Sequence, residues 1–262
     1  AMTGGIAATQ NANEADADTV AISTGLLPAW LGFTATTRQN DIDTSVTISF
    51  QPGMGANQAL GGGGNTENRQ AFLTFGDKSW GSVKMGKDLG IFGSTAILND
   101  MTLLGVGSNG AGTQHAGGAS GTTTTLGGIG TGYIYADWKG QIAYTTPNMN
   151  GFLATVGITQ PWNAEGDGVT SARSTGGSDN FAYEGQASYS WTGDFAGKAW
   201  VGAFYQDVTG LTADNLDEDA QAFEAGIATN VMNIGLTAYA YSGEGAGTAG
   251  MLVRGFDATG SA

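Results

Sequence analysis

The chain has 262 residues and a net charge of −14, and only 12% of its residues are charged. This length fits one large β domain or two ordinary domains, and the acidic charge argues against nucleic acid, or anionic lipid bound through a basic patch, as a partner. The sequence contains no cysteine, which excludes a disulfide framework and a thiolate metal site. Mean hydropathy is near zero, as in a soluble protein, but a membrane β-barrel averages to the same value because its strands alternate lipid-facing and lumen-facing residues.

Alternation of apolar and polar residues is the main structural signal, and it predicts about eleven β-strands. In the segment 43–52, for example, Val46, Ile48 and Phe50 alternate with serine, threonine and glutamine. Helical periodicity is scarce. The predicted strands are 29–38, 43–52, 69–77, 80–88, 138–147, 151–160, 182–191, 198–207, 220–229, 231–242 and 250–256.

Short turns and long connections alternate strictly along these strands. The short turns are at 38–43, 76–81, 146–151, 192–197 and 229–233. The long connections are at 51–68, 89–132, 161–181, 207–220 and 243–249. An up-and-down meander then has every short turn at one end and every long loop at the other, which is typical of a transmembrane antiparallel β-barrel.

Aromatic residues cluster at the ends of the predicted strands, where a membrane barrel carries its interfacial girdles. The alternative is a water-soluble β-sandwich, which packs its apolar face inward and rarely places large aromatic residues at strand ends on that face. The low share of charged residues also favours the membrane. The residues that we assign to the girdle are Trp30, Trp138, Trp162, Trp191 and Tyr183.

Three motifs resemble those of the trimeric Gram-negative general porins. They are NRQAFLTFGDKSWGSVKMGKDLG at 68–90, DMTLLGVG at 100–107 and IAYTTPNMNGF at 142–152, and they occur in the family's order and spacing. The resemblance covers most of 29–256. It implies a sixteen-stranded outer-membrane barrel, usually a homotrimer in lipid and lipopolysaccharide, that admits small hydrophilic solutes and ions passively. It also implies that the third loop, 89–132, folds into the lumen as a constriction.

The sequence departs from the family pattern in two places. About eleven strands are predicted instead of sixteen, and the end GFDATGSA lacks the terminal aromatic residue of such barrels. We therefore expect residues 1–262 to be a single barrel domain that is an internal portion of a longer protein, the alternative being a complete barrel of about twelve strands. In loop 3, Ser108 stands where the family carries an acid, so we expect no strongly polarised constriction.

Four charged residues are candidates for the pore constriction. The resemblance aligns Lys87 with the family's constriction arginine, and the alternation places Arg38 and Lys84 on the polar face. Lys87 shares parity with Met85, so it reaches the lumen only through a bulge or at the strand end. Asp100 is the nearest loop carboxylate and would oppose these cations. The alternatives are cations solvated at strand ends and, for Asp100, a helix N-cap at the start of DMTLL.

No enzymatic site is predicted. His115 is the only histidine, so neither a hydrolytic triad nor a transition-metal site can be built, and we expect no cofactor. The acidic run 214–221 fits a solvated external loop, with Ca²⁺ binding as the alternative. Acidic loops predict a weakly cation-selective diffusion channel. The alternative function is a non-catalytic surface structural or adhesive β-protein.

Overall fold

The computed structural model describes ten stretches of the chain. For the described residues up to 24, and for 208–211 and 216–218, it describes the backbone alone. The stretches are 2–3, 6–11, 19–24, 30–52, 68–100, 133–134, 136–161, 180–211, 216–232 and 234–244. Within them lie thirteen strands and one short helix, α1 (Ser94–Leu98). No helix in these stretches is long and apolar enough to cross a membrane.

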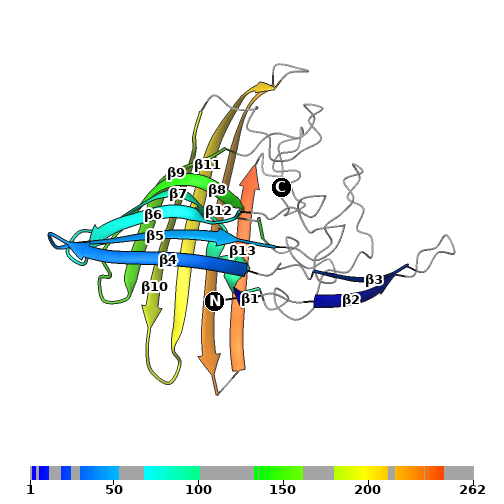
Figure 1. Cartoon of the computed structure of the whole chain (residues 1–262), viewed down its shortest axis with the longest axis horizontal. Coiled ribbons are helices and arrows are strands. Elements are labelled where there is room, and N and C mark those ends of the chain that lie inside the picture. The colour runs from blue at the N-terminus through cyan, green and yellow to red at the C-terminus, as the bar shows by residue number, and fades with distance from the viewer. Residues whose placement is uncertain are drawn as a thin grey trace.

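Ten consecutive strands, β4 to β13, form one antiparallel up-and-down sheet in which each strand pairs with the next (Figure 1). They are β4 (Trp30–Gln39), β5 (Ile42–Phe50), β6 (Ala71–Asp77), β7 (Gly81–Leu89), β8 (Trp138–Thr145), β9 (Phe152–Thr159), β10 (Ala182–Trp191), β11 (Gly197–Leu211), β12 (Leu216–Val231) and β13 (Ile234–Glu244). The two-residue β1 (Met2–Thr3) extends the sheet beside β4. β2 (Ile6–Asn11) and β3 (Thr19–Thr24) form a separate hairpin. Among these strands, β1 and β13 are the two edges of an unclosed sheet.

The sheet confirms ten of the predicted strands and changes their extent at one place. β11 and β12 run to residues 211 and 216, so they are longer than predicted and only 212–215 separate them. The extra pairs include Asp207 with Asp219, Val208 with Glu218 and Leu211 with Leu216, and the register shifts between Val208 and Leu211, so no regular alternation extends the sequence pattern here. The strands β1, β2 and β3 were not predicted. The predicted strand at 250–256 lies outside the described residues.

The short turns all fall at the same end of the meander, as predicted. Consecutive strands are antiparallel neighbours, and short turns alternate with long connections along the chain, so each kind of connection stays at its own end. The turn between β4 and β5 contains only Asn40 and Asp41, whose φ angles are 50° and 62°. A two-residue hairpin with a type I′ turn needs positive φ at both central positions, and Asn and Asp adopt this conformation more readily than most residues. The sequence therefore specifies this tight turn directly.

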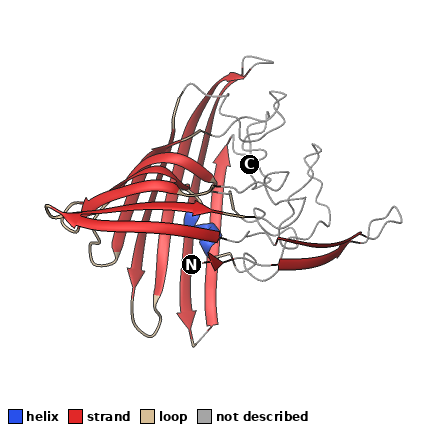
Figure 2. Cartoon of the chain, in the orientation of Figure 1, coloured by secondary structure: helices blue, strands red, loops and turns tan. Residues whose placement is uncertain are grey.

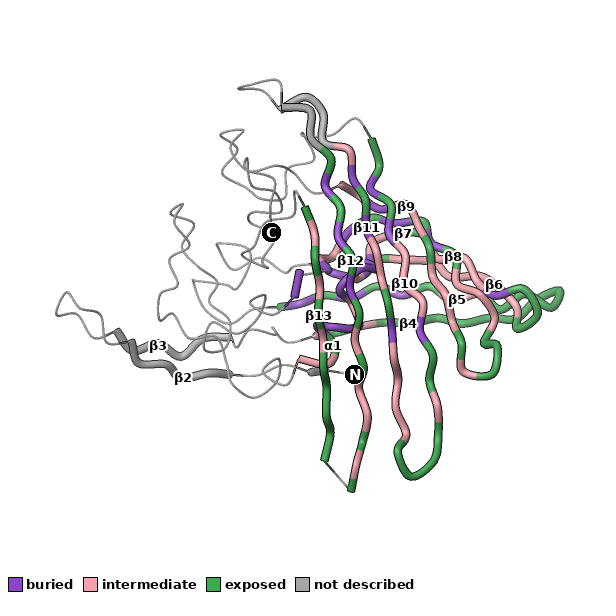
Figure 3. Tube along the Cα trace, turned by 180° about the vertical axis from the view of Figure 1, so that it is seen from behind, coloured by how far each residue is buried: buried purple, intermediate pink, exposed green. Residues whose placement is uncertain are grey.

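The apolar face of the sheet is exposed and the polar face is partly buried (Figure 3). On β5, Val46 and Ile48 are 43% and 41% exposed, whereas Thr47 and Ser49 between them are buried. On β10, Tyr183 is 53% exposed and the adjacent Glu184 only 4%. This is the reverse of a water-soluble sandwich, which buries its apolar face. The alternation matches lipid outside and a polar interior.

The helix α1 lies on the concave side of the curved sheet (Figure 2). The small hydrophobic core is on this side too, and it is centred on residues that precede or belong to α1. Ile91, Phe92 and Ile97 are buried there together with Phe204 of β11. The ring of Phe92 meets that of Phe204 edge-on at 5.1 Å. We call this concave side the inner face.

Candidate functional site

The segment Gly90–Asp100, which follows β7 and contains α1, lies against the inner face. It starts the loop that the sequence predicts to fold inward. Its first residue donates its backbone N–H to the carbonyl of Asp137 at 2.7 Å, just before β8 begins. Gly93 has a φ of 74°, and a Cβ there would lie 2.5 Å from the carbonyl oxygen of Ile134. Only glycine fits this turn into α1 without strain. Residues 101–132 of the loop lie outside the described stretches.

A buried carboxylate on the sheet anchors the root of this segment. Glu184 Oε2 accepts the backbone N–H groups of Ile91 at 2.7 Å and Phe92 at 2.9 Å. Its other oxygen, Oε1, accepts the Thr159 hydroxyl at 3.0 Å and forms an ion pair with Lys139. Burying a lone carboxylate would be costly, but these four donors and the opposite charge compensate it. We call these contacts the Glu184 anchor.

A second group of polar contacts joins α1 to the strands farther along the sheet. The Thr95 hydroxyl donates to Gln186 Oε1 at 2.6 Å. The amide of Gln186 donates to Glu224 Oε1 at 3.0 Å, and the Tyr239 hydroxyl donates to the other oxygen of Glu224 at 2.8 Å. These contacts link α1 with β10, β12 and β13. The segment is thereby fixed to one side of the concave space.

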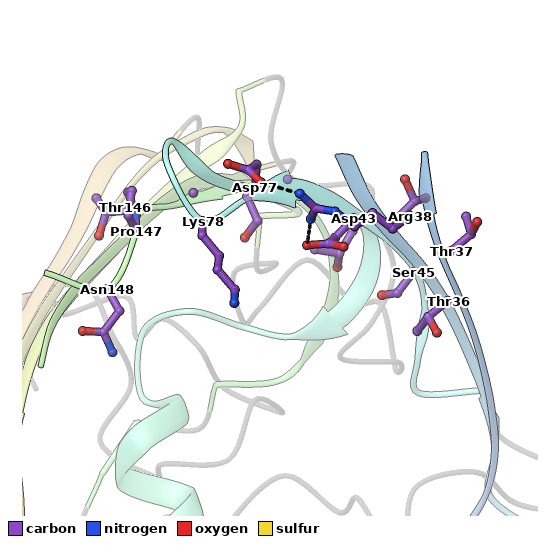
Figure 4. Close-up of a pocket in the computed structure, with 15 residues that line it drawn as sticks. Thr36, Thr37, Arg38, Asp43, Ser45, Asp77, Lys78, Thr146, Pro147 and Asn148 are labelled. Carbon is purple, nitrogen blue, oxygen red and sulfur yellow. Dashed lines mark hydrogen bonds and ion pairs between the residues drawn. The ribbon is translucent and has the colours of Figure 1, made fainter. Parts of the chain in front are cut away.

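A cavity of about 850 Å³ opens at the short-turn end of the inner face (Figure 4). It is lined by β4 to β7 and by the turn after β8. Arg38 lies at its edge and donates to Asp43 at 2.6 Å and to Asp77 at 3.1 Å, so that it bridges three adjacent strands. Thr36 and Ser45 also line it, beside this ion-pair network. Charged and hydroxyl side chains thus contribute to the lining of this cavity.

Of the predicted cations, Lys84 lies on the inner face and Lys87 on the outer one. Lys84 forms an ion pair with Asp88 and lies over the ring of Phe72 at 5.1 Å. Lys87 pairs across the ladder with Ala71 and Gly140, both of them exposed on the outer face. Its Nζ donates to a backbone carbonyl, that of Asn68, at 2.8 Å. The bulge that would turn Lys87 inward is absent from the described pairings of β7.

Asp100 follows the C-terminal end of α1. Its backbone N–H donates to the carbonyl of Ile97 at 3.1 Å, and its carboxylate accepts the Tyr133 hydroxyl at 2.8 Å. The residue before it, Asn99, is the C-cap of the helix. The predicted alternative, an N-cap at Asn99 or Asp100 for a helix at DMTLL, depends on residues from 101 on, which lie outside the described stretches, and stays a prediction. The structure does not bring Asp100 into contact with Arg38, Lys84 or Lys87 among the contacts that the described residues make.

The predicted girdle residues fall into three groups. Tyr183 and Trp191 lie on the outer face, and Trp191 packs near-parallel to Tyr189 at 6.3 Å. Trp30 lies on the inner face, where its Nε1–H donates to Gln70 at 3.1 Å. This differs from the prediction because position 30 has the parity of the polar residues of its strand. Trp138 is half-buried beneath the Arg69 guanidinium, 5.8 Å from it. Trp162 lies outside the described residues.

Other aromatic residues on the outer face extend the girdle that the sequence predicted. Trp80 lies in the turn between β6 and β7, and its carbonyl accepts the Tyr144 hydroxyl at 2.6 Å. Both rings are exposed at the short-turn end. The sequence also places Trp80 among the aromatic residues at strand ends, whereas its contact with Tyr144 depends on the pairing of β7 with β8.

The Glu184 anchor was not predicted at all, although its residues are visible in the alternation. Glu184 lies on the polar face of its strand, and Lys139 follows Trp138 at the start of another. Their contact needs the register of three strands, which a pattern of single strands does not provide.

The described residues contain no group of three or more histidine, cysteine, aspartate or glutamate side chains that could hold a metal ion. His115 and residues 214–215 of the acidic run lie outside those stretches, and the side chains of 216–218 are likewise not described. The expectations for these residues, Ca²⁺ included, stay predictions.

Comparison with known protein families identifies the chain. The family model of the Gram-negative porins matches residues 2–260. The chain belongs to the Gram-negative porin family. An outer-membrane diffusion channel therefore accounts for the exposed apolar face, and the outer membrane of a Gram-negative bacterium is where such a porin resides.

Solved porin structures share the fold at low sequence identity. An anion-selective porin from Comamonas acidovorans has a TM-score of 0.58 and 16% identity over 93% of this chain and 68% of its own. The outer-membrane channel DcaP of Acinetobacter baumannii has a TM-score of 0.58 and 15% identity over 93% of this chain and 61% of its own. This chain thus spans about two thirds of the length of these porins. No curated protein matches it.

We expect a Glu184→Gln variant to hold the backbone at Ile91 and Phe92 less firmly than the original chain does. The amide keeps the size of the side chain but loses the charge that pairs with Lys139 and strengthens the bonds from Ile91 and Phe92. A hydrogen bond to a charged group contributes about 1.5–3 kcal/mol, so hydrogen exchange at these two amides should become about 10-fold faster or more. Glu244→Gln at the exposed end of β13 is the control. Unchanged exchange at Ile91 and Phe92 would show that the carboxylate does not hold the segment.

Proposed function

We propose that the chain forms the wall of a passive diffusion channel for small hydrophilic solutes and ions. The observation that carries this proposal is the reversed polarity of the sheet. Phe33, Val156 and Phe223 are about 60% exposed on the outer face, where they would contact lipid. Water and solutes would contact the hydroxyl, amide and charged groups of the inner face. No catalytic role is assigned.

The segment Gly90–Asp100 would narrow this channel. It occupies part of the concave space and is fixed to β10 by the Glu184 anchor and by Thr95. Solutes would then pass between the segment and the inner face of β4 to β7, and be sieved by size. Arg38 and Lys84 are the cations along that path, and Asp100 is the carboxylate at the end of the described part of the segment. We propose these three residues as the charges nearest the constriction.

The proposed ion selectivity is weakly cationic. The net charge of −14 would concentrate cations near the mouths of the channel within about 10 Å, the Debye length at 0.1 M salt. The fold does not decide this property, since the structurally similar Comamonas porin is described as anion-selective. The charges of this chain therefore have to be tested on their own.

Conductance and reversal potential in planar bilayers test the proposed channel and its selectivity together. Stepwise current increases in symmetric salt are expected as the protein inserts. Under a salt gradient the reversal potential should be small and have the sign of a cation-selective channel. This potential should become smaller as the salt concentration rises, because salt screens the surface charges. Absence of current steps would favour the structural or adhesive alternative. A potential of anionic sign would overturn the cation selectivity alone.

We also propose that the protein is a homotrimer, with lipid and lipopolysaccharide around the remaining outer face. The wide apolar outer face supports this, because exposed residues such as Phe33, Val46 and Ile48 can pack against a second copy as readily as against lipid. In gel electrophoresis, an unheated sample should migrate at about three times the mass of a boiled one, since barrels and their oligomers resist detergent until heated. A single band of monomer mass before and after heating would contradict the trimer.

A further inference from the structure

Charged side chains on the inner face of β4 to β8 form ion pairs with neighbours in the wall, which lie in adjacent strands and turns and, in one case, on β10. The pairs are Arg38 with Asp43 (2.6 Å), Asp77 (3.1 Å) and Asp41 (3.6 Å), Lys84 with Asp88, and Lys139 with Glu184. These eight side chains carry three positive and five negative charges. Opposite charges in contact largely cancel at the distance of a passing solute. This part of the wall therefore offers a permeating ion little net attraction.

Hydroxyl groups occupy much of the surface between these pairs. Thr34 and Thr36 of β4 are exposed on the inner face, and Ser45, Thr74 and Ser82 of the next three strands are half-buried. Across the ladder, Ser45 pairs with Thr36 and with Thr74, which makes one continuous row over three strands. A hydroxyl group can both donate and accept a hydrogen bond. The row can thus exchange hydrogen bonds with a solute whatever way the solute's own hydroxyls point.

The cavity of about 850 Å³ lies directly on this row. Thr36, Ser45, Thr74 and Ser82 line it, and Asn148 reaches in from the turn after β8 (Figure 4). Its volume is in the range of small-molecule sites, about 300–1,000 Å³. Lys78 also reaches in from the turn after β6 and has no ion-pair partner among the described residues. Its single positive charge offsets one of the two extra negative charges of the paired groups.

We propose that this hydroxyl row makes the channel prefer uncharged, polyhydroxylated solutes, such as sugars and polyols, over ions of the same size. The inference rests on the proposed channel function and names its substrate class. A sugar that leaves water at the row regains its hydrogen bonds there, whereas an ion loses hydration and meets charges that, apart from Lys78, are already paired. The weak cation selectivity then comes from acidic groups near the mouths of the channel and not from this wall.

Uptake of three solutes of nearly equal size into liposomes that hold the protein tests the preference. Labelled glucose is neutral, gluconate is an anion, and glucosamine below neutral pH is a cation. Glucose is expected to enter at least about threefold faster than both ions, a ratio that corresponds to less than 1 kcal/mol. Glucose should remain the fastest of the three solutes at high salt, because salt screens only the acidic charges near the mouths of the channel.

Two variants of one ion pair test the role of charge cancellation. Lys84→Gln leaves Asp88 uncompensated and should raise the uptake of glucosamine relative to glucose. Asp88→Asn leaves Lys84 uncompensated and should raise that of gluconate. Lys87→Gln is the matched control, because the same change on the outer face should alter neither ratio.

A double variant tests the hydroxyl row without altering any charge. Thr36→Val together with Thr74→Val keeps the side-chain shape and removes two hydroxyls, so the advantage of glucose over both ions should fall. If glucose does not enter at all, the proposed channel itself fails. If glucose enters no faster than gluconate or glucosamine, or if the double variant keeps the full advantage, the channel stands and the hydroxyl preference is overturned.

Discussion

The antiparallel hydrogen-bond ladder from β4 to β13 is the constraint on which the rest of the structure depends. Lipid offers no hydrogen bonds to the backbone, so a spanning segment has to satisfy its own N–H and C=O groups through its neighbours. In this chain each strand pairs with the next over most of its length. Tight turns such as Asn40–Asp41 keep the register, and a slip by one residue would move every apolar side chain to the wrong face.

The fixed register has a second consequence, which is the narrowing of the channel. Alternation turns Glu184 of β10 and Lys139 of β8 toward the inner face, with Thr159 of β9 between them. Glu184 then meets the first N–H groups of the segment that follows β7. The carboxylate thereby holds the two residues before Gly93, the N-cap of α1. The root of the inward segment is thus coupled to the sheet through this buried charge pair.

The sequence predicted those features that depend on a local pattern. Alternation in segments such as 43–52 was sufficient to predict ten strands and the polarity of their two faces, because successive side chains of a strand point to opposite faces of the sheet. The pattern was weaker where the pairing is irregular, as at the extended ends of β11 and β12. It gave no basis for contacts between distant strands, so the Glu184 anchor was missed. Lys87 shows the limit of family resemblance, since its motif matched a pore position while its own parity indicated the outer face.

The central claim is that the apolar face contacts lipid and the polar face contacts water. Labelling of single cysteines along β4 tests this claim most directly. The chain has no cysteine of its own, so each introduced thiol is the only one. Phe33, Ala35, Thr34 and Thr36 are all exposed and alternate between the two faces. In lipid bilayers, a charged maleimide should label Thr34→Cys and Thr36→Cys but not Phe33→Cys or Ala35→Cys. Labelling of all four, or only of the Phe33 and Ala35 variants, would contradict the account.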